Sequence, residues 1–233
     1  MTMPRETPTA SPKATSRKMY ARLMLAWVFL PLIFLIAGGS LGWWEAWAYC
    51  AVLLVPMSVF GVHMARVDPA FIERRFSMKE KEQTQRRVVS WGSPLIVALY
   101  VVPGLDRRFG WSEPPLVAVV VAQVLALGAY LGVLRVFLVN RWAGRTVETR
   151  PGQQVVSTGP YAVVRHPMYA ASLVFFLASP LALGSGWALI PAILYVPVLV
   201  ARIVNEEGVL VRELAGYEDY RAKVRYRLVP FIW

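Results

Sequence analysis

The sequence contains little of what most catalytic templates require. There is a single cysteine, Cys50, which excludes a disulfide framework and a multi-cysteine metal site. The two histidines, His63 and His166, lie far apart in the sequence and have no metal-ligand spacing, so no metal site is expected. A glycine-rich loop of the kind that cradles phosphates is also absent. Any chemistry must therefore depend on other residue types.

Charge is scarce as well, and apolar residues take its place. Charged residues make up 17% of the chain and hydrophobic residues 57%, with a mean hydropathy of +0.47, which is typical of proteins that contact lipid. Six apolar runs are long enough to approach or cross a hydrocarbon core of ~30 Å. They lie at about 20–38, 45–64, 88–103, 115–139, 168–184 and 187–204. The sequence predicts an all-α, polytopic integral membrane protein with about six transmembrane helices.

The net charge of +11 follows the topology of these runs. Of the 25 Lys and Arg residues, 22 lie in the termini and alternate loops that share one side, 2 lie on the other side, and Arg135 lies within a run. Positive residues collect on the cytoplasmic side of membrane proteins, so both termini are expected there. The charge therefore indicates membrane topology and attraction to anionic lipid, and no nucleic-acid partner is expected.

The chain reads as one membrane domain, 19–233, after a polar segment, 1–18, that is predicted to be disordered. Within the domain, 19–139 holds the N-terminal spans and 140–233 the C-terminal part. A cleaved signal peptide is the alternative for the first run, but the next run follows so closely that a retained span is favoured. The basic loop 65–87 contains Phe71, Ile72, Phe76 and Met78, a pattern typical of a segment on an anionic inner leaflet, with partner binding as the alternative.

Two polar clusters adjoin the last two runs, which are joined only by "GSGW" and predict a helical hairpin that crosses the bilayer or enters it partway. "STGPYAVVRHPMY" precedes the hairpin and "ARIVNEE" ends it. The hairpin brings His166 and Tyr169 towards Arg202, Glu206 and Glu207. Arg202 and Glu206, four residues apart, share a helical face. Each residue alone also fits a structural role as an anchor or a solvated face.

Charged groups at a membrane boundary are costly unless they are paired or functional, so the clusters together predict a cytoplasmic polar pocket beneath membrane helices. Such a pocket suits a charged, soluble cofactor that meets a lipid-borne substrate. The segments "VVSTGPYAVVRHPMYAASLVFF" and "EEGVLVRELAGYEDYRAKVRYRLVPFIW" resemble the C-terminal signature of the isoprenylcysteine carboxyl methyltransferase family. The resemblance covers roughly 145–233, and "GWWEAW", "VDPAFIERR" and "LDRRFGWS" are similar to its bacterial branch.

The resemblance implies a multi-pass enzyme of the bacterial inner membrane that uses S-adenosylmethionine to methylate a lipophilic acceptor. The acceptor group that it favours is a carboxylate. It implies that Arg202 faces that acceptor and that either Glu206 or Glu207 contacts the cofactor. An amine or thiol acceptor would need deprotonation, and Glu207, His166 or a tyrosine would then serve as the base. The cofactor-binding residues implied are Val155, Val156, Tyr161, His166, Pro167, Met168, Tyr169 and Glu206, and the catalytic residues are Arg202, Glu206 and Glu207.

Two other classes of protein remain open. The tail "GYEDYRAKVRYRLVPFIW" and the Arg-His-Pro-x-Tyr turn also resemble sterol reductases, which bind NADPH in the same C-terminal architecture but are usually larger. A non-catalytic membrane protein with a degenerate pocket is the third possibility. Binding of S-adenosylmethionine, of NADPH, or of neither separates the three.

Overall fold

The computed structural model describes residues 12–77, 83–143, 149 and 152–233, and the regular elements among them are helices. Five are long: α1 (Pro12–Gly38), α2 (Trp44–Val67), α4 (Gln83–Phe109), α5 (Leu116–Val139) and α7 (Leu189–Glu213). The shorter elements are α3 (Pro69–Ser77), α6 (Pro167–Ala182), α8 (Tyr217–Lys223) and a single 3-10 turn, η1 (Gly159–Ala162).

The five long helices have the length and composition of membrane spans. Each contains an apolar segment of 24 to 27 residues, and at 1.5 Å per residue a helix of this length exceeds the ~30 Å hydrocarbon core. Large apolar side chains such as Trp91 and Val117 are 80% and 74% exposed, as lipid-facing residues are. The predicted all-α, multi-pass membrane protein is thereby confirmed. The run predicted at 168–184 forms α6, which has only 16 residues.

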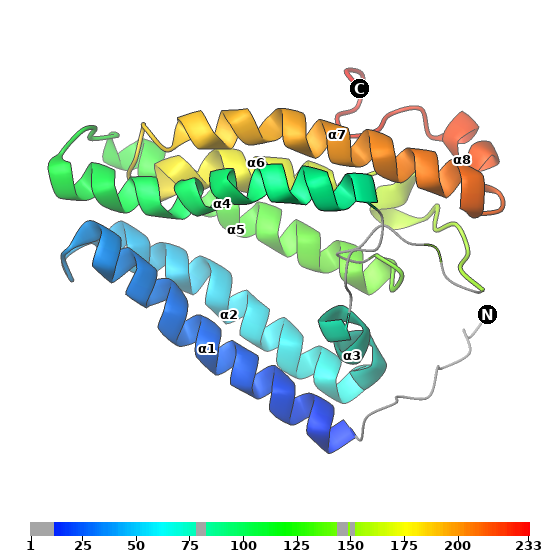
Figure 1. Ribbon diagram of the computed structural model, residues 1–233, viewed down its shortest axis with the longest axis horizontal. Helices are drawn as coiled ribbons and strands as arrows, with labels where there is room; N and C mark the ends of the chain where they lie inside the picture. The colour runs from blue at the N-terminus through cyan, green and yellow to red at the C-terminus, as the bar shows by residue number, and fades with distance from the viewer. Residues whose placement is uncertain (1–11, 78–82, 144–148, 150–151) are drawn as a thin grey trace.

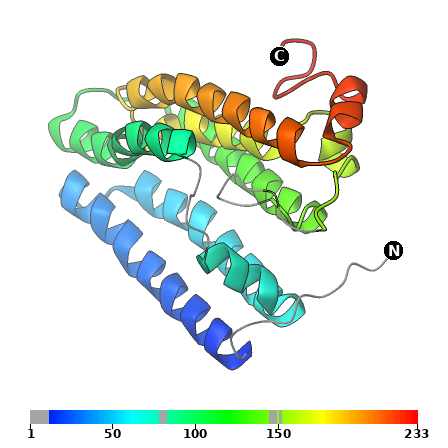
Figure 2. The same cartoon turned by 45° about the vertical axis from the view of Figure 1, so that its right-hand side comes forward.

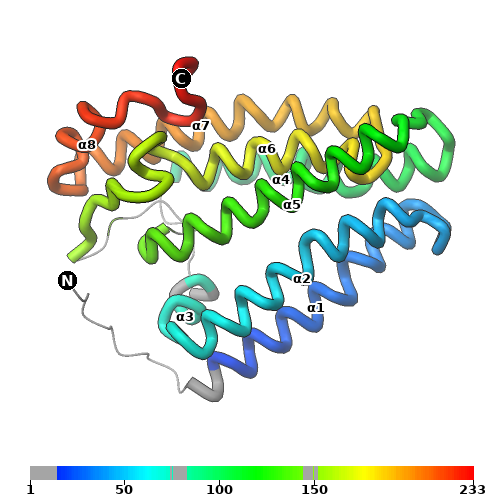
Figure 3. Tube along the Cα trace, turned by 180° about the vertical axis from the view of Figure 1, so that it is seen from behind, coloured from blue at the N-terminus to red at the C-terminus, as the bar shows by residue number. Residues whose placement is uncertain are grey.

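The helices form two groups (Figure 1). α1 and α2 are an antiparallel pair, and α4, α5, α6 and α7 lie together beside them; α1 contacts α4, and α2 contacts α5. Views from two other directions show the same division, with α3 at the end where the two groups lie furthest apart (Figures 2 and 3). The start of α1 lies at the same end of the bundle as α8.

A close backbone approach joins the groups at the opposite end. A Cβ atom on Gly104 of α4 would lie 2.3 Å from the Cβ of Ala37 in α1, so only glycine fits this crossing. Small residues at helix crossings are how membrane helices pack closely. Beside this contact, the fully buried Asp106 accepts hydrogen bonds from Ser112 N (2.7 Å), Ser112 Oγ (2.7 Å) and Ser185 Oγ (2.5 Å). These bonds tie the end of α4 to the α6–α7 turn and so orient the hairpin.

Three expectations from the sequence need correction or restriction. Residues 12–18 are helical where disorder was predicted, and residues 1–11 of that segment lie outside the described residues. In α3, Phe71 and Ile72 are 3% and 5% exposed and pack against the protein rather than lipid, because Phe60 and Phe137 offer an apolar surface. Nothing is described for the side chain of Phe76 or for Met78.

The last long helix, α7, extends beyond its predicted apolar run. The run ends at residue 204, whereas α7 continues without interruption to Glu213. Arg202, Glu206 and Glu207 therefore all lie on one rigid helix rather than in a segment that follows the hairpin. Their relative directions are fixed by helical geometry, at about 100° per residue.

Candidate functional site

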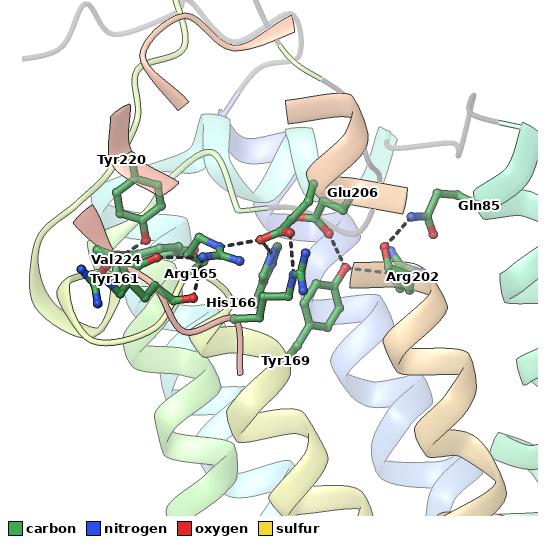
Figure 4. A network of polar contacts seen from close by, with 12 residues as sticks. Gln85, Tyr161, Arg165, His166, Tyr169, Arg202, Glu206, Tyr220 and Val224 are labelled. Atoms are coloured by element: carbon green, nitrogen blue, oxygen red, sulfur yellow. Dashed lines mark hydrogen bonds and ion pairs between the residues drawn. The ribbon is translucent and has the colours of Figure 1, made fainter. Parts of the chain in front are cut away.

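The hairpin brings the predicted polar clusters together at the end of the bundle that carries α8 (Figure 4). A pocket lies here, with about 770 Å³ of space between its walls when the open solvent at its mouth is included. Its walls come from the end of α5, the segment 153–166, the start of α6, the last turns of α7, and α8. They comprise Asn140, Trp142, Ala143, Gln153, Gln154, Val155, Val156, Tyr161, Arg165, His166, Met168, Tyr169, Glu206, Leu210, Leu214, Tyr217 and Tyr220.

A buried ion cluster supports one wall of this pocket. The Glu207 carboxylate accepts hydrogen bonds from Arg165 Nε (2.5 Å) and Arg227 Nε (2.7 Å), and His166 Nε2 lies 3.3 Å from it. The side chains of Arg165 and Glu207 are only 6% and 5% exposed, so neither charge could be buried without the other. Glu207 therefore holds two arginines and a histidine from two different segments in one place.

Arg165 also holds the C-terminal segment against the start of α6. Its Nη1 donates to the carbonyl oxygens of Val224 and Arg225, each at 2.8 Å, and its backbone N–H donates to the carbonyl of Tyr226 at 2.9 Å. Pro167, the first residue of α6, needs no backbone acceptor and suits this position. The Arg-His-Pro turn is thus fixed from both sides, which gives the residues after it a defined direction.

A second hydrogen-bonded chain runs from the pocket into the bundle (Figure 4). Tyr169 Oη donates to Glu206 Oε2 (2.5 Å) and accepts from Arg202 Nε (2.8 Å). The carbonyl oxygen of Arg202 accepts from Nε2 of Gln85, at 3.0 Å, and Gln85 is fully buried on α4. The chain links a pocket carboxylate to an arginine one helical turn deeper, and the arginine to the N-terminal half of the protein.

Tyr161 closes the opposite wall. Its carbonyl oxygen accepts from Tyr220 Oη (2.8 Å), and its hydroxyl oxygen accepts from Asn140 Nδ2 (2.9 Å). Burial raises the pKa of Tyr161 to about 12, so the phenol stays neutral at physiological pH and offers an aromatic surface rather than a charge. α5, η1 and α8 are joined through this one residue.

Most of the site residues predicted from the sequence lie together in the structure, but only some of them line the pocket. Seven line the pocket: Val155, Val156, Tyr161, His166, Met168, Tyr169 and Glu206. Pro167 is buried in the first turn of α6, and Arg202 and Glu207 lie behind the wall, in contact with residues that line it. Of the two adjacent carboxylates, Glu206 faces the pocket and Glu207 faces the buried cluster.

Several wall residues were missed by sequence reasoning. Leu210 and Leu214 lie four and eight residues after Glu206, so the helical period could have placed them on the same face. Tyr217 and Tyr220 belong to the "GYEDY" motif, but nothing in the sequence shows that α8 folds back over the pocket. Trp142 follows α5 in a short turn, and no local pattern marked it.

The lining suits a nucleoside that carries positive charge. The Glu206 carboxylate offers a counter-ion, and the faces of Tyr161 and Tyr169 offer surfaces for an aromatic base or a cation. Val155 and Val156 line the pocket from a segment without regular secondary structure. Among the described residues, no three His, Cys, Asp or Glu side chains come together as a metal site would require. These features fit S-adenosylmethionine, a sulfonium nucleoside.

The fold and site together define a multi-pass, all-helical membrane protein with a pocket at the end of the bundle that carries α8. Among protein families, the model described as phospholipid methyltransferase matches residues 117–215, less than half of the chain. The match runs from α5 through α7 and so carries most of the pocket walls. The segment that holds most of the pocket walls is therefore similar to the phospholipid methyltransferase family.

A relative comes from Alcaligenes xylosoxydans xylosoxydans, where it is described as nickel-cobalt-cadmium resistance protein NccN. It is 25% identical to this chain over 142 residues, which cover 59% of this chain and 62% of the relative. The chain thus spans less than two thirds of the length of that protein.

Proposed function

We propose that this protein is an integral membrane methyltransferase that transfers a methyl group from S-adenosylmethionine to a lipophilic acceptor. The observation that carries the proposal is the pocket itself. Glu206, His166 and Tyr169 line a pocket at the end of apolar helices, inside a segment that matches a methyltransferase family. A water-soluble cofactor and a lipid-borne acceptor can meet only at such a boundary.

Within this proposal each polar residue has its own task. When bound, the cofactor supplies an electrophilic methyl group on a positively charged sulfur. Glu206 provides the opposite charge, and Tyr169 holds the Glu206 carboxylate in place by its hydrogen bond. Val155, Val156, Tyr161, His166 and Met168 shape the cavity around the cofactor, and Pro167 fixes the turn that presents them. Glu207 binds no ligand and keeps Arg165 and His166 in position.

For the acceptor we propose a carboxylate, as in protein C-terminal isoprenylcysteine carboxyl methylation. Arg202 lies one turn deeper than Glu206, and a guanidinium is well suited to bind a carboxylate. A carboxylate is already ionised near neutral pH, so no general base is required and catalysis is chiefly alignment. Holding two reactants in line can lower a barrier by about 7–11 kcal/mol. Exclusion of water by the surrounding helices strengthens the fixed charges.

The orientation follows from charge. The loops and termini rich in Lys and Arg belong to the α3 and α8 end of the bundle, which we place in the cytoplasm, where S-adenosylmethionine is available. A bacterial inner membrane is the setting proposed.

The test is calorimetric titration of the detergent-purified protein with S-adenosylhomocysteine, with NADPH in parallel. Saturable binding of S-adenosylhomocysteine that weakens at least tenfold in Glu206→Gln supports the proposal. Glu213→Gln is the matched control, because Glu213 is an exposed carboxylate on the same helix outside the pocket. Binding of NADPH alone would assign the protein to the reductases, and binding of neither ligand would leave a non-catalytic protein.

The acceptor class is tested separately with labelled methyl donor and a prenylcysteine analogue. A carboxyl methyl ester releases volatile methanol in base, whereas methylated amines and thiols do not. Base-stable label would refute the carboxylate acceptor and leave the cofactor assignment intact.

A further inference from the structure

Two hydrogen-bond donors in the pocket wall have no acceptor among the residues that the structure describes. Trp142 Nε1 and Tyr217 Oη are both buried, and neither makes a hydrogen bond within the part of the chain that the structure describes. Both residues line the pocket. Because buried polar groups in proteins are nearly always paired, each unpaired group calls for an explanation.

Other tyrosine hydroxyls in the pocket wall do make hydrogen bonds. Tyr169 Oη donates to Glu206, and Tyr220 Oη donates to the carbonyl of Tyr161. Far from the pocket, the hydroxyl of the fully buried Tyr49 pairs with Ser179 Oγ at 2.6 Å. The hydroxyls of Tyr49, Tyr169 and Tyr220 thus have partners, whereas among the described residues Trp142 Nε1 and Tyr217 Oη have none, at positions where a ligand would sit.

Tyr217 is suited to remain a donor. It is 4% exposed, and burial, reinforced by the charge of Glu207, raises its pKa above the usual value for tyrosine. The phenol therefore keeps its proton at any physiological pH. The indole N–H of Trp142 can act only as a donor. Acceptor atoms of a ligand can therefore satisfy both groups.

We propose that Trp142 and Tyr217 are a pair of ligand-binding donors that recognise acceptor atoms of the nucleoside cofactor. The assignment rests on the proposed function. Trp142 follows α5, and Tyr217 begins α8 beyond the end of the matched segment, so the pair comes from two ends of the C-terminal part. Ring nitrogens, ribose oxygens and the carboxylate of an S-adenosyl amino acid are acceptors of the required kind.

Removal of the Tyr217 hydroxyl should affect ligand binding and the stability of the ligand-free protein differently. A phenol with no partner in the ligand-free protein contributes no hydrogen bond, so its removal in Tyr217→Phe should not destabilise that state. The same removal should weaken ligand binding, because the bond exists only in the complex. A tyrosine with a purely structural hydroxyl behaves in the opposite way.

The experiment compares detergent-purified wild type with Tyr217→Phe, Trp142→Phe and the control Tyr49→Phe. Calorimetry measures the affinity for S-adenosylhomocysteine, and thermal unfolding without ligand measures Tm. We expect Tyr217→Phe and Trp142→Phe to bind about 5- to 100-fold more weakly. We expect the ligand-free Tm of Tyr217→Phe to equal or exceed that of wild type, whereas Tyr49→Phe should lower Tm by about 2–4 °C and keep wild-type affinity.

Two results would overturn the assignment while leaving the proposed function in place. One is wild-type affinity in both Tyr217→Phe and Trp142→Phe. The other is a fall in the ligand-free Tm of Tyr217→Phe as large as that of Tyr49→Phe, which would mean that the hydroxyl is paired without ligand. A wild-type protein that fails to bind S-adenosylhomocysteine would remove the proposed function and this assignment with it.

Discussion

Replacement of Glu207 by glutamine should destabilise the protein more than the same change at Glu206. Glu207 neutralises Arg165, whose side chain is 6% exposed, and breaking a buried pair by removal of one partner costs about 3–5 kcal/mol. The bond to Arg227 adds less than about 1 kcal/mol, because that side chain is 33% exposed and water can replace the bond. A loss of about 3–5 kcal/mol corresponds to a fall in Tm of roughly 6–20 °C for a chain of this size.

Glu206→Gln is the matched control, one residue away on the same helix. Glu206 is only half-buried, and it accepts its hydrogen bond from the neutral hydroxyl of Tyr169, so Tm should fall by less than about 4 °C. Thermal unfolding of the two detergent-purified variants, followed by titration with S-adenosylhomocysteine, gives both readouts. Equal falls in Tm, or the larger fall in Glu206→Gln, would refute the division of roles between the two carboxylates.

Three further changes probe the contacts around the site. Arg202→Ala should lower turnover at least tenfold and change the affinity for S-adenosylhomocysteine by less than about threefold; the reverse pattern would move Arg202 to the cofactor. Gln85→Leu removes the buried donor to the Arg202 carbonyl, so turnover should fall more than cofactor affinity, and equal losses in the two would contradict a positioning role. Asp106→Asn, at the far end of the bundle, places an amide N–H₂ group opposite hydroxyl and N–H donors, so it should lower the free energy of unfolding by about 1–3 kcal/mol, seen as a lower Tm. Cofactor affinity should stay at the wild-type value. A loss of affinity would show that the two ends of the bundle are coupled.

The apolar runs predicted the long helices because a membrane span must pair its backbone groups within itself and must be apolar over ~30 Å. The same reasoning underestimated α7, because a helix that leaves the bilayer stays helical after its residues become polar. It also failed for α3. Phe71 and Ile72 are apolar residues of the kind that face lipid, but they pack against α2 and α5. The composition of a segment does not show whether its apolar side chains contact lipid or a neighbouring helix.

The candidate site shows a similar division. The short α6–α7 connection is enough to bring His166 and Tyr169 close to Arg202 and the two carboxylates, and the sequence shows that connection directly. The folding of α8 and the C-terminal segment back over the pocket is not visible in it, so Tyr217 could not be placed. That placement depends on Arg165, which binds backbone carbonyls about sixty residues further along the chain.

The sequence by itself determined a helical membrane protein with a polar site where its last two apolar helices meet one membrane surface. Hydropathy and chain connectivity suffice for that, because both are properties of the linear order of residues. Only the tertiary structure decided that Glu206 faces the cofactor pocket while Glu207 is buried among Arg165, His166 and Arg227. Successive residues on a helix point about 100° apart, and what each one meets depends on which distant segments pack around that helix.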